Sequence, residues 1–357
     1  MKVMIIAARY GNGHISVSNA IAKMKNNCKK DISFTIVVPA THYIKKINTT
    51  TALYVYNNIV SKYTKDSIIK KTYDKTYFFG ANTKLFYTFQ KNDGRFATKK
   101  LLTEINPDVV IETFPCEFNA PKDLLRVCVI TDYNFAKVYI ANTPAIYCIP
   151  APFIKNKLIK AGIKEEHIYQ TGIPVKKEFF QENNSDSCKK ILLTLGARGQ
   201  ISAKDVEKII NSCLKNNIEL IIVCGKNKEL YDELKDRKNI ICYGYVNFME
   251  KLIKEVDCVI TKSGGISVSE CICSEKPMII NIDQSLGGQE RMNQNYIRMQ
   301  QIGLIGKINE IDKLINGMCN QDVYQKIVKN IKRVKKENYQ ENILDVINKN
   351  LKNKKDC

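Results

Sequence analysis

Short apolar runs alternate with amphipathic stretches along the first half of the chain. Five runs are rich in Val and Ile and apolar at nearly every position, which is typical of parallel strands covered on both faces. We expect strands over Val3–Ala8, Ser33–Val38, Val109–Glu112, Val127–Thr131 and Ala145–Ile149. Amphipathic segments such as Ser16–Asn26 and Ala97–Ile105 supply the connecting helices. This pattern predicts a doubly wound α/β domain.

The second half of the chain repeats the alternation. Its expected strands are Ile191–Leu195, Glu219–Cys224, Ile240–Gly244, Asp257–Thr261 and Pro277–Ile282. Its expected helices lie near Lys204–Lys215, Lys226–Lys235, Met249–Glu255 and Ile266–Ser274. Two successive arrays of this kind predict two doubly wound parallel sheets, with a ligand-binding cleft between them.

A polar stretch without periodicity, Gln181–Ser187, separates the two arrays and is interpreted as a linker. We place an N-terminal domain at residues 1–176, the linker at 177–188 and a C-terminal domain at 189–320. Residues 321–357 form a basic tail, helical by pattern, that can fold back on the N-terminal domain.

Composition narrows the class of protein. Hydrophobic residues make up 44% and charged residues 26% of the 357 positions, which excludes a disordered or collagen-like chain. No apolar run reaches the roughly 18 residues that a transmembrane helix needs, and Val3–Ala8 is too short for a signal-peptide core. The 13 cysteines include no Cys-x-x-Cys pair and only three histidines accompany them. We therefore expect a reducing, cytoplasmic location and no metal site.

The net charge of +20 favours an anionic partner. The excess of basic residues is distributed unevenly along the chain. Residues 43–102 hold 12 Lys or Arg, 3 Asp or Glu and 12 Phe or Tyr. This basic, aromatic segment suits a membrane interface. The alternatives are a helical core segment with a solvated lysine face, or a platform for single-stranded nucleic acid, which we do not expect.

A glycine-containing loop follows the first expected strand. Its sequence is Arg9-Tyr10-Gly11-Asn12-Gly13-His14. The glycines let a ligand approach backbone N–H groups at a helix start, and His14 is a candidate general base. The alternative is a histidine that only caps the turn. Ser16 stands where a dinucleotide fingerprint has its third glycine, so a Rossmann cofactor site is disfavoured.

Two further glycine-containing loops lie in the second half. Lys262-Ser263-Gly264-Gly265 precedes a helix that can hold a diphosphate at its N-terminus, and Glu270 is placed to bind ribose hydroxyls. Gly287-Gly288-Gln289-Glu290, with Asn293, offers amides and carboxylates for hexose hydroxyls. Either loop alone can be an ordinary surface loop, but together they point to a nucleotide sugar. The chain lacks Asp-x-Asp, a P-loop and a Gly-x-Ser-x-Gly elbow, which disfavours metal-dependent glycosyltransferases, nucleotide hydrolases and serine hydrolases.

The ordered motifs resemble glycosyltransferase family 28, and within it the monogalactosyldiacylglycerol synthases and processive diacylglycerol glucosyltransferases. The matching motifs are Gly11–His14, Thr131-Asp132-Tyr133, Thr171–Val175, Cys224–Asn227, Gly244-Tyr245, Thr261–Gly265, Ser269-Glu270 and Gly288–Glu290 with Asn293. The resemblance spans about residues 1–310. It implies a GT-B fold and inverting transfer from a UDP-hexose without a bound metal or other cofactor.

The resemblance also implies roles for single residues. His14 would be the base that activates the acceptor hydroxyl. The implied donor-binding residues are Gly196, Arg198, Tyr245, Val246, Ser263, Gly264, Gly265, Glu270, Gln289, Glu290 and Asn293. The implied acceptor or membrane-facing residues are Gly13, Tyr54, Tyr56, Phe78, Phe79, Phe86, Phe89 and Asp132. Tyr245 and Val246 match a uracil-binding position, and Arg198 can reach a phosphate.

One departure bears on the acceptor. The lipid glycosyltransferases usually carry a histidine and a tryptophan after the Thr-Asp-Tyr motif, whereas this chain has Asn134–Tyr139 and no tryptophan at all. We expect a peripheral enzyme on the cytoplasmic face of the membrane that moves glucose or galactose from UDP-hexose to diacylglycerol. The alternatives are another acceptor, such as an undecaprenyl-linked intermediate or a non-lipid molecule, a UDP-sugar 2-epimerase, and a non-catalytic basic binding protein.

Overall fold

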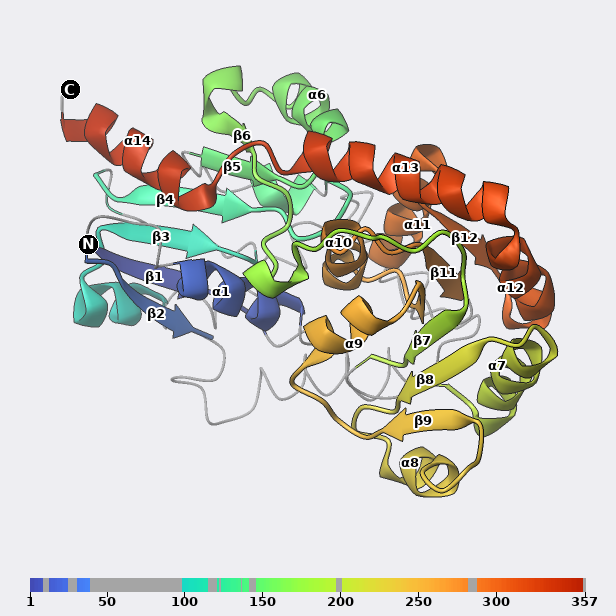
Figure 1. Cartoon of the computed structure of the whole chain (residues 1–357). Helices are drawn as coiled ribbons and strands as arrows, with labels where there is room; N and C mark the ends of the chain where they lie inside the picture. Colours follow the sequence, from blue (N-terminus) through green and yellow to red (C-terminus); the bar gives the residue numbers. More distant parts are fainter. Residues whose placement is uncertain are drawn as a thin grey trace, which may run out of the picture. The chain divides into compact units, whose positions relative to one another are not determined.

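The computed structural model describes residues 1–8, 13–24, 31–38, 98–114, 121, 123–135, 137–140, 146–196, 201–281 and 288–355. These residues form two compact units, each built around its own sheet (Figure 1). The first unit combines Met1–Lys176 and Glu337–Cys357 with the short stretch Leu286–Gly288, and the second consists of Lys177–Ser285 and Gln289–Lys336. The first unit is therefore made from both ends of the chain.

The sheet of the first unit is parallel, with strand order β2-β1-β3-β4-β5-β6. The strands are β1 (Lys2–Ile6), β2 (Ser33–Val37), β3 (Val109–Glu112), β4 (Leu125–Val129), β5 (Ile146–Ile149) and β6 (Ile168–Gln170). Central strands such as β3 and β4 are buried at every position, because helices and loops cover both faces. Five of these strands match the predicted ones within a few residues, and β6 was not predicted.

Helices connect the strands of the first unit. They are α1 (Gly13–Lys23), a helix over 98–105, η3 (Lys137–Ile140), α6 (Pro152–Lys160), η4 (Glu165–His167) and α14 (Ile343–Lys355). The helix α6 starts with a proline in its first turn, where the missing backbone N–H costs no hydrogen bond. The C-terminal helix α14 packs against β4 of this sheet.

The sheet of the second unit is also parallel, with strand order β12-β11-β10-β7-β8-β9. The strands are β7 (Lys190–Thr194), β8 (Glu219–Val223), β9 (Ile240–Tyr243), β10 (Cys258–Thr261), β11 (Met278–Asn281) and β12 (Gly303–Gly306). The order is doubly wound, since the chain moves from β7 to one edge and then returns to β10 on the other side. The architecture of two doubly wound parallel sheets is thus confirmed.

Several helices of the second unit are amphipathic, and some of them begin with a side-chain cap. The helices of this unit are η5 (Lys177–Phe179), α7 (Ala203–Lys215), α8 (Lys228–Leu234), α9 (Met249–Glu255), α10 (Gly265–Cys273), α11 (Gly288–Gln300), η7 (Ile308–Glu310), α12 (Ile311–Cys319) and α13 (Gln321–Asn338). At α7, the side chain of Ser202 accepts the N–H of Asp205, and at α8 Asn227 accepts that of Leu230. Among the helices of the described ranges, none combines the length and apolar content needed to cross a bilayer.

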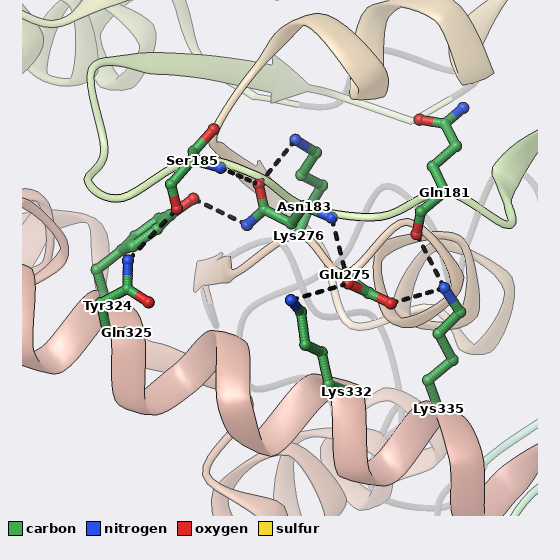
Figure 2. Close-up of polar contacts among 9 residues, drawn as sticks. All are labelled: Gln181, Asn183, Ser185, Glu275, Lys276, Tyr324, Gln325, Lys332 and Lys335. Atoms are coloured by element: carbon green, nitrogen blue, oxygen red, sulfur yellow. Dashed lines mark hydrogen bonds and ion pairs between the residues drawn. The ribbon is translucent and has the colours of Figure 1, made fainter.

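The segment predicted as a linker is fixed to the second unit by a polar cluster (Figure 2). The carboxylate of Glu275 accepts the backbone N–H of Asn183 at 3.2 Å and lies 2.8 Å from Lys335 Nζ on α13. Lys335 also donates to the carbonyl of Gln181 at 2.8 Å, and Lys276 donates to Asn183 Oδ1 at 3.2 Å. Buried charges of this kind need such partners, and here they bind the segment to the ends of α10 and α13.

Candidate functional site

The first unit has a candidate site at the switch point of its sheet. The chain leaves β1 toward β2 on one side, whereas β3 lies on the other, so the loops after β1 and β3 diverge at the carboxyl edge. Ligands of doubly wound sheets bind in the crevice opened by such diverging loops. His14 stands in the first turn of α1, after β1, and Thr113 directly follows β3. A contact between positions 99 residues apart therefore forms at this crevice.

The imidazole of His14 has a defined tautomer. Its Nδ1 lies 2.7 Å from the backbone carbonyl oxygen of Thr113, a group that can only accept a hydrogen bond. Burial lowers the pKa of His14 to about 4, although the hydrogen bond to Thr113 opposes the shift. At neutral pH the ring is therefore uncharged, with the proton on Nδ1 and a lone pair on Nε2. This is the state that a general base requires.

Small polar side chains hold this histidine in place. Thr113 donates its hydroxyl and its backbone N–H to the carbonyl of Ile6, at 3.1 and 3.0 Å. Ser18, one turn further along α1, donates its hydroxyl to the carbonyl of His14 at 2.8 Å. Phe114 meets the imidazole edge-to-face, with ring centroids 5.1 Å apart and an interplanar angle of 81°. The imidazole of His14 is therefore oriented by β1, α1 and the loop after β3 together.

Residues after β4 extend the candidate site of the first unit. Thr131 Oγ1 lies 3.5 Å from His14 Nδ1 and 3.4 Å from the hydroxyl of Tyr139. Burial raises the pKa of the Tyr139 phenol well above its usual range, and the nearby Asp132 adds to the effect. Asp132 is partly exposed beside Thr131, and Gly13 is the first residue of α1. The structure thus brings the predicted His14, Gly13 and Asp132 to one end of one sheet.

The second unit has its own candidate site at the switch point of its sheet. Here β7 and β10 are neighbours, and the loops after them carry Gly196 and Gly264. Gly196 has a φ of +67°, which an L side chain rarely adopts. Gly264 is the N-cap of α10 and has no side-chain cap, so its helix presents backbone N–H groups and the positive end of its dipole. These features suit an anion such as a diphosphate.

The first turn of α11 is tied to the loop after β10. Asn293 is buried, and its Nδ2 donates to the carbonyl of Ser263 at 2.9 Å. The hydroxyl of Ser263 donates to the carbonyl of Glu290 at 2.9 Å and lies 3.2 Å from Gln294 Nε2. These bonds join the start of α11 to the loop after β10. The sequence predicts a sugar contact for Asn293, and the structure adds a positioning contact that the pattern did not reveal.

The remaining predicted donor residues have varied environments. Glu270 is partly exposed on α10, one turn after its start, and Gln289 and Glu290 are partly exposed in the first turn of α11. Tyr245 follows β9 and is 62% exposed, with the partly exposed Val246 beside it. These side chains are accessible to a ligand at the carboxyl edge of the sheet.

Some predicted site residues lie outside the described residues. They are Arg198, Tyr54, Tyr56, Phe78, Phe79, Phe86 and Phe89. Most of the basic, aromatic segment 43–102 also lies there, so its membrane role stays a prediction.

Comparison with known proteins adds to this geometry. Residues 14–175 match the family model described as monogalactosyldiacylglycerol (MGDG) synthase. Residues 191–354 match the glycosyltransferase family 28 C-terminal domain. The solved structure of Acinetobacter baumannii MurG aligns over 98% of this chain and all of its own, with a TM-score of 0.57 and 13% identity, a likeness of fold.

Two curated relatives span most of the chain. The processive diacylglycerol beta-glucosyltransferase of Bacillus subtilis strain 168 is 27% identical, covering 97% of this chain and 94% of its own. The enzyme of the same name from Bacillus cytotoxicus is 30% identical, covering 83% and 79%. The two doubly wound sheets with these loops define a glycosyltransferase of the GT-B fold. Within that class, the chain belongs to the diacylglycerol glycosyltransferases of glycosyltransferase family 28.

Proposed function

We propose that this enzyme transfers a hexose from UDP-hexose to the free hydroxyl of diacylglycerol with inversion, forming a β-glycosyldiacylglycerol. The observation that carries the proposal is the hydrogen bond from His14 Nδ1 to the carbonyl of Thr113 at 2.7 Å. It leaves Nε2 as a neutral base at the switch point of the first sheet, where an alcohol acceptor would need one.

In the proposed reaction, the acceptor oxygen attacks C1 of the hexose while its proton passes to Nε2 of His14. The bond from C1 to the diphosphate oxygen breaks, and its electron pair leaves with UDP. The loop after β10 and the start of α10 would hold the diphosphate through backbone N–H groups, and Glu270 would hold the ribose. We expect no dependence on a bound metal or cofactor, so turnover should survive dialysis against EDTA.

Glucose is the sugar we favour over galactose. The two curated relatives are named as glucosyltransferases and align with 83% or more of this chain. The family model over residues 14–175 carries a galactolipid name, but this part is the acceptor half of the chain rather than the donor half. The partly exposed Gln289 and Glu290, positioned with the help of the buried Asn293, can satisfy the hydroxyls of either hexose.

Membrane association is part of the proposal. The basic, aromatic segment 43–102 would hold the enzyme at the cytoplasmic surface of an anionic membrane, with each lysine near the surface worth about 1 kcal/mol. Association with liposomes should rise with the anionic lipid content and fall with added salt. Binding that is absent, or that ignores salt, would contradict this part alone.

The decisive experiment supplies radiolabelled UDP-glucose, UDP-galactose or UDP-N-acetylglucosamine separately, with diacylglycerol in anionic micelles. We expect lipid-soluble label from UDP-glucose, and NMR of the product should show a β-linkage. Label from UDP-galactose instead would change the sugar only. Binding of UDP without any labelled lipid would move the acceptor elsewhere, starting at residues 134–139. Failure to bind UDP at all would refute the proposal.

A further inference from the structure

The side chain of Lys262 lies across the two glycine loops of the second sheet. Lys262 directly follows β10, at the switch point between β10 and β7. A Cβ placed on Gly196 would stand 3.5 Å from Lys262 Cε, and one placed on Gly264 would stand 4.0 Å from the same atom. The lysine stem therefore lies close to both loops that would enclose a diphosphate.

The ammonium group of Lys262 is oriented by a carboxylate at the start of α11. Its Nζ lies 3.1 Å from Glu290 Oε1, in the first turn of α11. The Lys262 side chain is 35% exposed and that of Glu290 13% exposed. Since Ser263 also bonds the backbone of Glu290, the carboxylate is held firmly next to the lysine. An ammonium can donate three hydrogen bonds, so a contact with Glu290 is compatible with binding a further anion.

The chemistry of the site calls for such a cation. A diphosphate carries negative charge, and the charge on its terminal oxygen increases as the bond to the sugar breaks. The uncapped start of α10 offers only partial positive charge. A lysine beside it supplies a full charge in a partly desolvated place, where it counts for more than in water.

We propose that Lys262 binds the diphosphate of the sugar donor and stabilises the leaving UDP, with Glu290 as its positioning residue. This inference rests on the proposed function and names the residue that would neutralise the leaving group. As C1 forms its bond to the acceptor oxygen, the electron pair of the broken bond goes to the diphosphate oxygen next to Lys262, and the acceptor proton goes to His14. Glu290 can keep its contact throughout.

Calorimetric titration of the full chain with UDP and with uridine tests the proposal. In Lys262→Met, which keeps the stem and removes the charge, we expect UDP affinity to fall about 10- to 100-fold. Uridine affinity should stay within about twofold, because uridine has no phosphate. Lys262→Arg should recover most of the UDP affinity, since the charge returns. With UDP-glucose, kcat should fall in Lys262→Met, because the charge grows during the reaction.

Lys190 provides a matched control on the same sheet. It begins β7 at the opposite, amino-terminal edge, and its Nζ lies 3.4 Å from Glu219 Oε2 with the lysine 26% exposed. Lys190→Met should leave both affinities within about twofold, because this pair is far from the carboxyl edge. If Lys262→Met does not fold, as judged by circular dichroism, Lys262→Gln makes the same comparison.

Two results would overturn the proposal. The first is equal loss of UDP and uridine, which would mean that Lys262 only shapes the loops. The second is unchanged UDP affinity in a folded variant. Wild-type protein that fails to bind UDP would instead refute the proposed function, so the two failures are separable.

Discussion

The imidazole of His14 is oriented by the backbone carbonyl of Thr113, 2.7 Å from its Nδ1, rather than by a carboxylate. A carbonyl does not ionise, so it fixes the tautomer without adding a negative charge that would raise the pKa of the ring. The imidazole is therefore neutral at physiological pH, and burial sets its protonation state.

This environment predicts an unusual acid limb of the pH profile. The pKa of His14 is lowered to about 4, below the usual 6.5 of histidine, so the ring stays neutral and active as the pH falls through 6. We expect kcat/KM to be flat down to about pH 5 and to decline only near pH 4. The decline should follow the protonated fraction, with circular dichroism confirming that the protein is folded. A break near pH 6.5 would contradict the buried environment.

Removing the imidazole of His14 should lower the rate of transfer more than it weakens donor binding. We expect His14→Ala to lower kcat by about 10²- to 10⁴-fold, the usual range for a general base. UDP affinity should stay near that of the wild type, because Gly264, Gly265 and Glu270, the proposed diphosphate and ribose residues, belong to the other unit. Thr113→Val is the matched control: it keeps the carbonyl that His14 contacts and loses only the hydroxyl, which bonds the carbonyls of Ile6 and His14 and lies 3.2 Å from Ser18 Oγ. Its kcat should fall less than about tenfold, since only positioning is weakened. Equal loss of UDP affinity in His14→Ala would make His14 a structural residue.

The proposed role of Glu270 can be tested through the ribose hydroxyls of UDP. We expect Glu270→Ala to weaken UDP binding about tenfold, because a charged acceptor for two hydroxyls is lost. The wild-type protein should bind UDP more tightly than 2′-deoxy-UDP, and the variant should bind both alike. Calorimetry with the two nucleotides measures the difference. Discrimination that persists in the variant would assign the ribose to another residue.

Gly172 should not accept any side chain. Its φ is +67°, and an added Cβ would stand 2.3 Å from Tyr339 Cε1, whose hydroxyl bonds the carbonyl of Ile173 at 2.9 Å. Gly172→Ala should therefore cost at least about 2 kcal/mol, through backbone strain and displacement of the ring. Gly162→Ala is the control, since Gly162 has a φ of +91° with nothing within 4 Å of an added Cβ. Urea denaturation should show a clearly larger loss in the free energy of unfolding for Gly172→Ala than for Gly162→Ala. Equal losses would mean that the Tyr339 ring moves aside at little cost.

The cluster around Glu275 predicts a stability effect in the second unit (Figure 2). Glu275→Gln should destabilise it by about 1–3 kcal/mol, because Lys335 loses its carboxylate partner in a mostly buried place. Lys215→Gln breaks an exposed pair with Asp312, whose side chains are 72% and 58% exposed, and should cost less than about 0.5 kcal/mol. Denaturant midpoints compare the two. Similar small effects would make the cluster an ordinary surface network.

Much of the fold could be predicted because central parallel strands are short, continuous apolar runs. The two strands that were missed, β6 and β12, are both edge strands. An edge strand needs fewer apolar residues: β6 is Ile-Tyr-Gln, and β12 begins and ends with glycine. Their positions depend on tertiary contacts that no local pattern records.

The candidate site was predicted only in part for a related reason. Glycine loops after strands are visible in the sequence, and they indicated His14, Gly264 and Gly265. Two side-chain pairings could not be seen in the sequence. Thr113 lies 99 residues from His14, and Glu290 lies 28 residues from Lys262. Only the strand order brings these residues together.

The division of the first unit between the two chain ends has a consequence for how the protein is made. Gln340 and Glu341 donate their backbone N–H groups to the carbonyl of Gln170, so the chain after α13 covers the edge strand β6. These residues emerge from the ribosome about 170 residues after β6, roughly 10 to 30 seconds later at usual rates of synthesis. In that interval the second unit can be completed while the first still exposes a strand edge. A nascent chain of this enzyme would therefore finish its middle before its beginning, and a premature stop within α13 would leave that edge open to pairing with other chains.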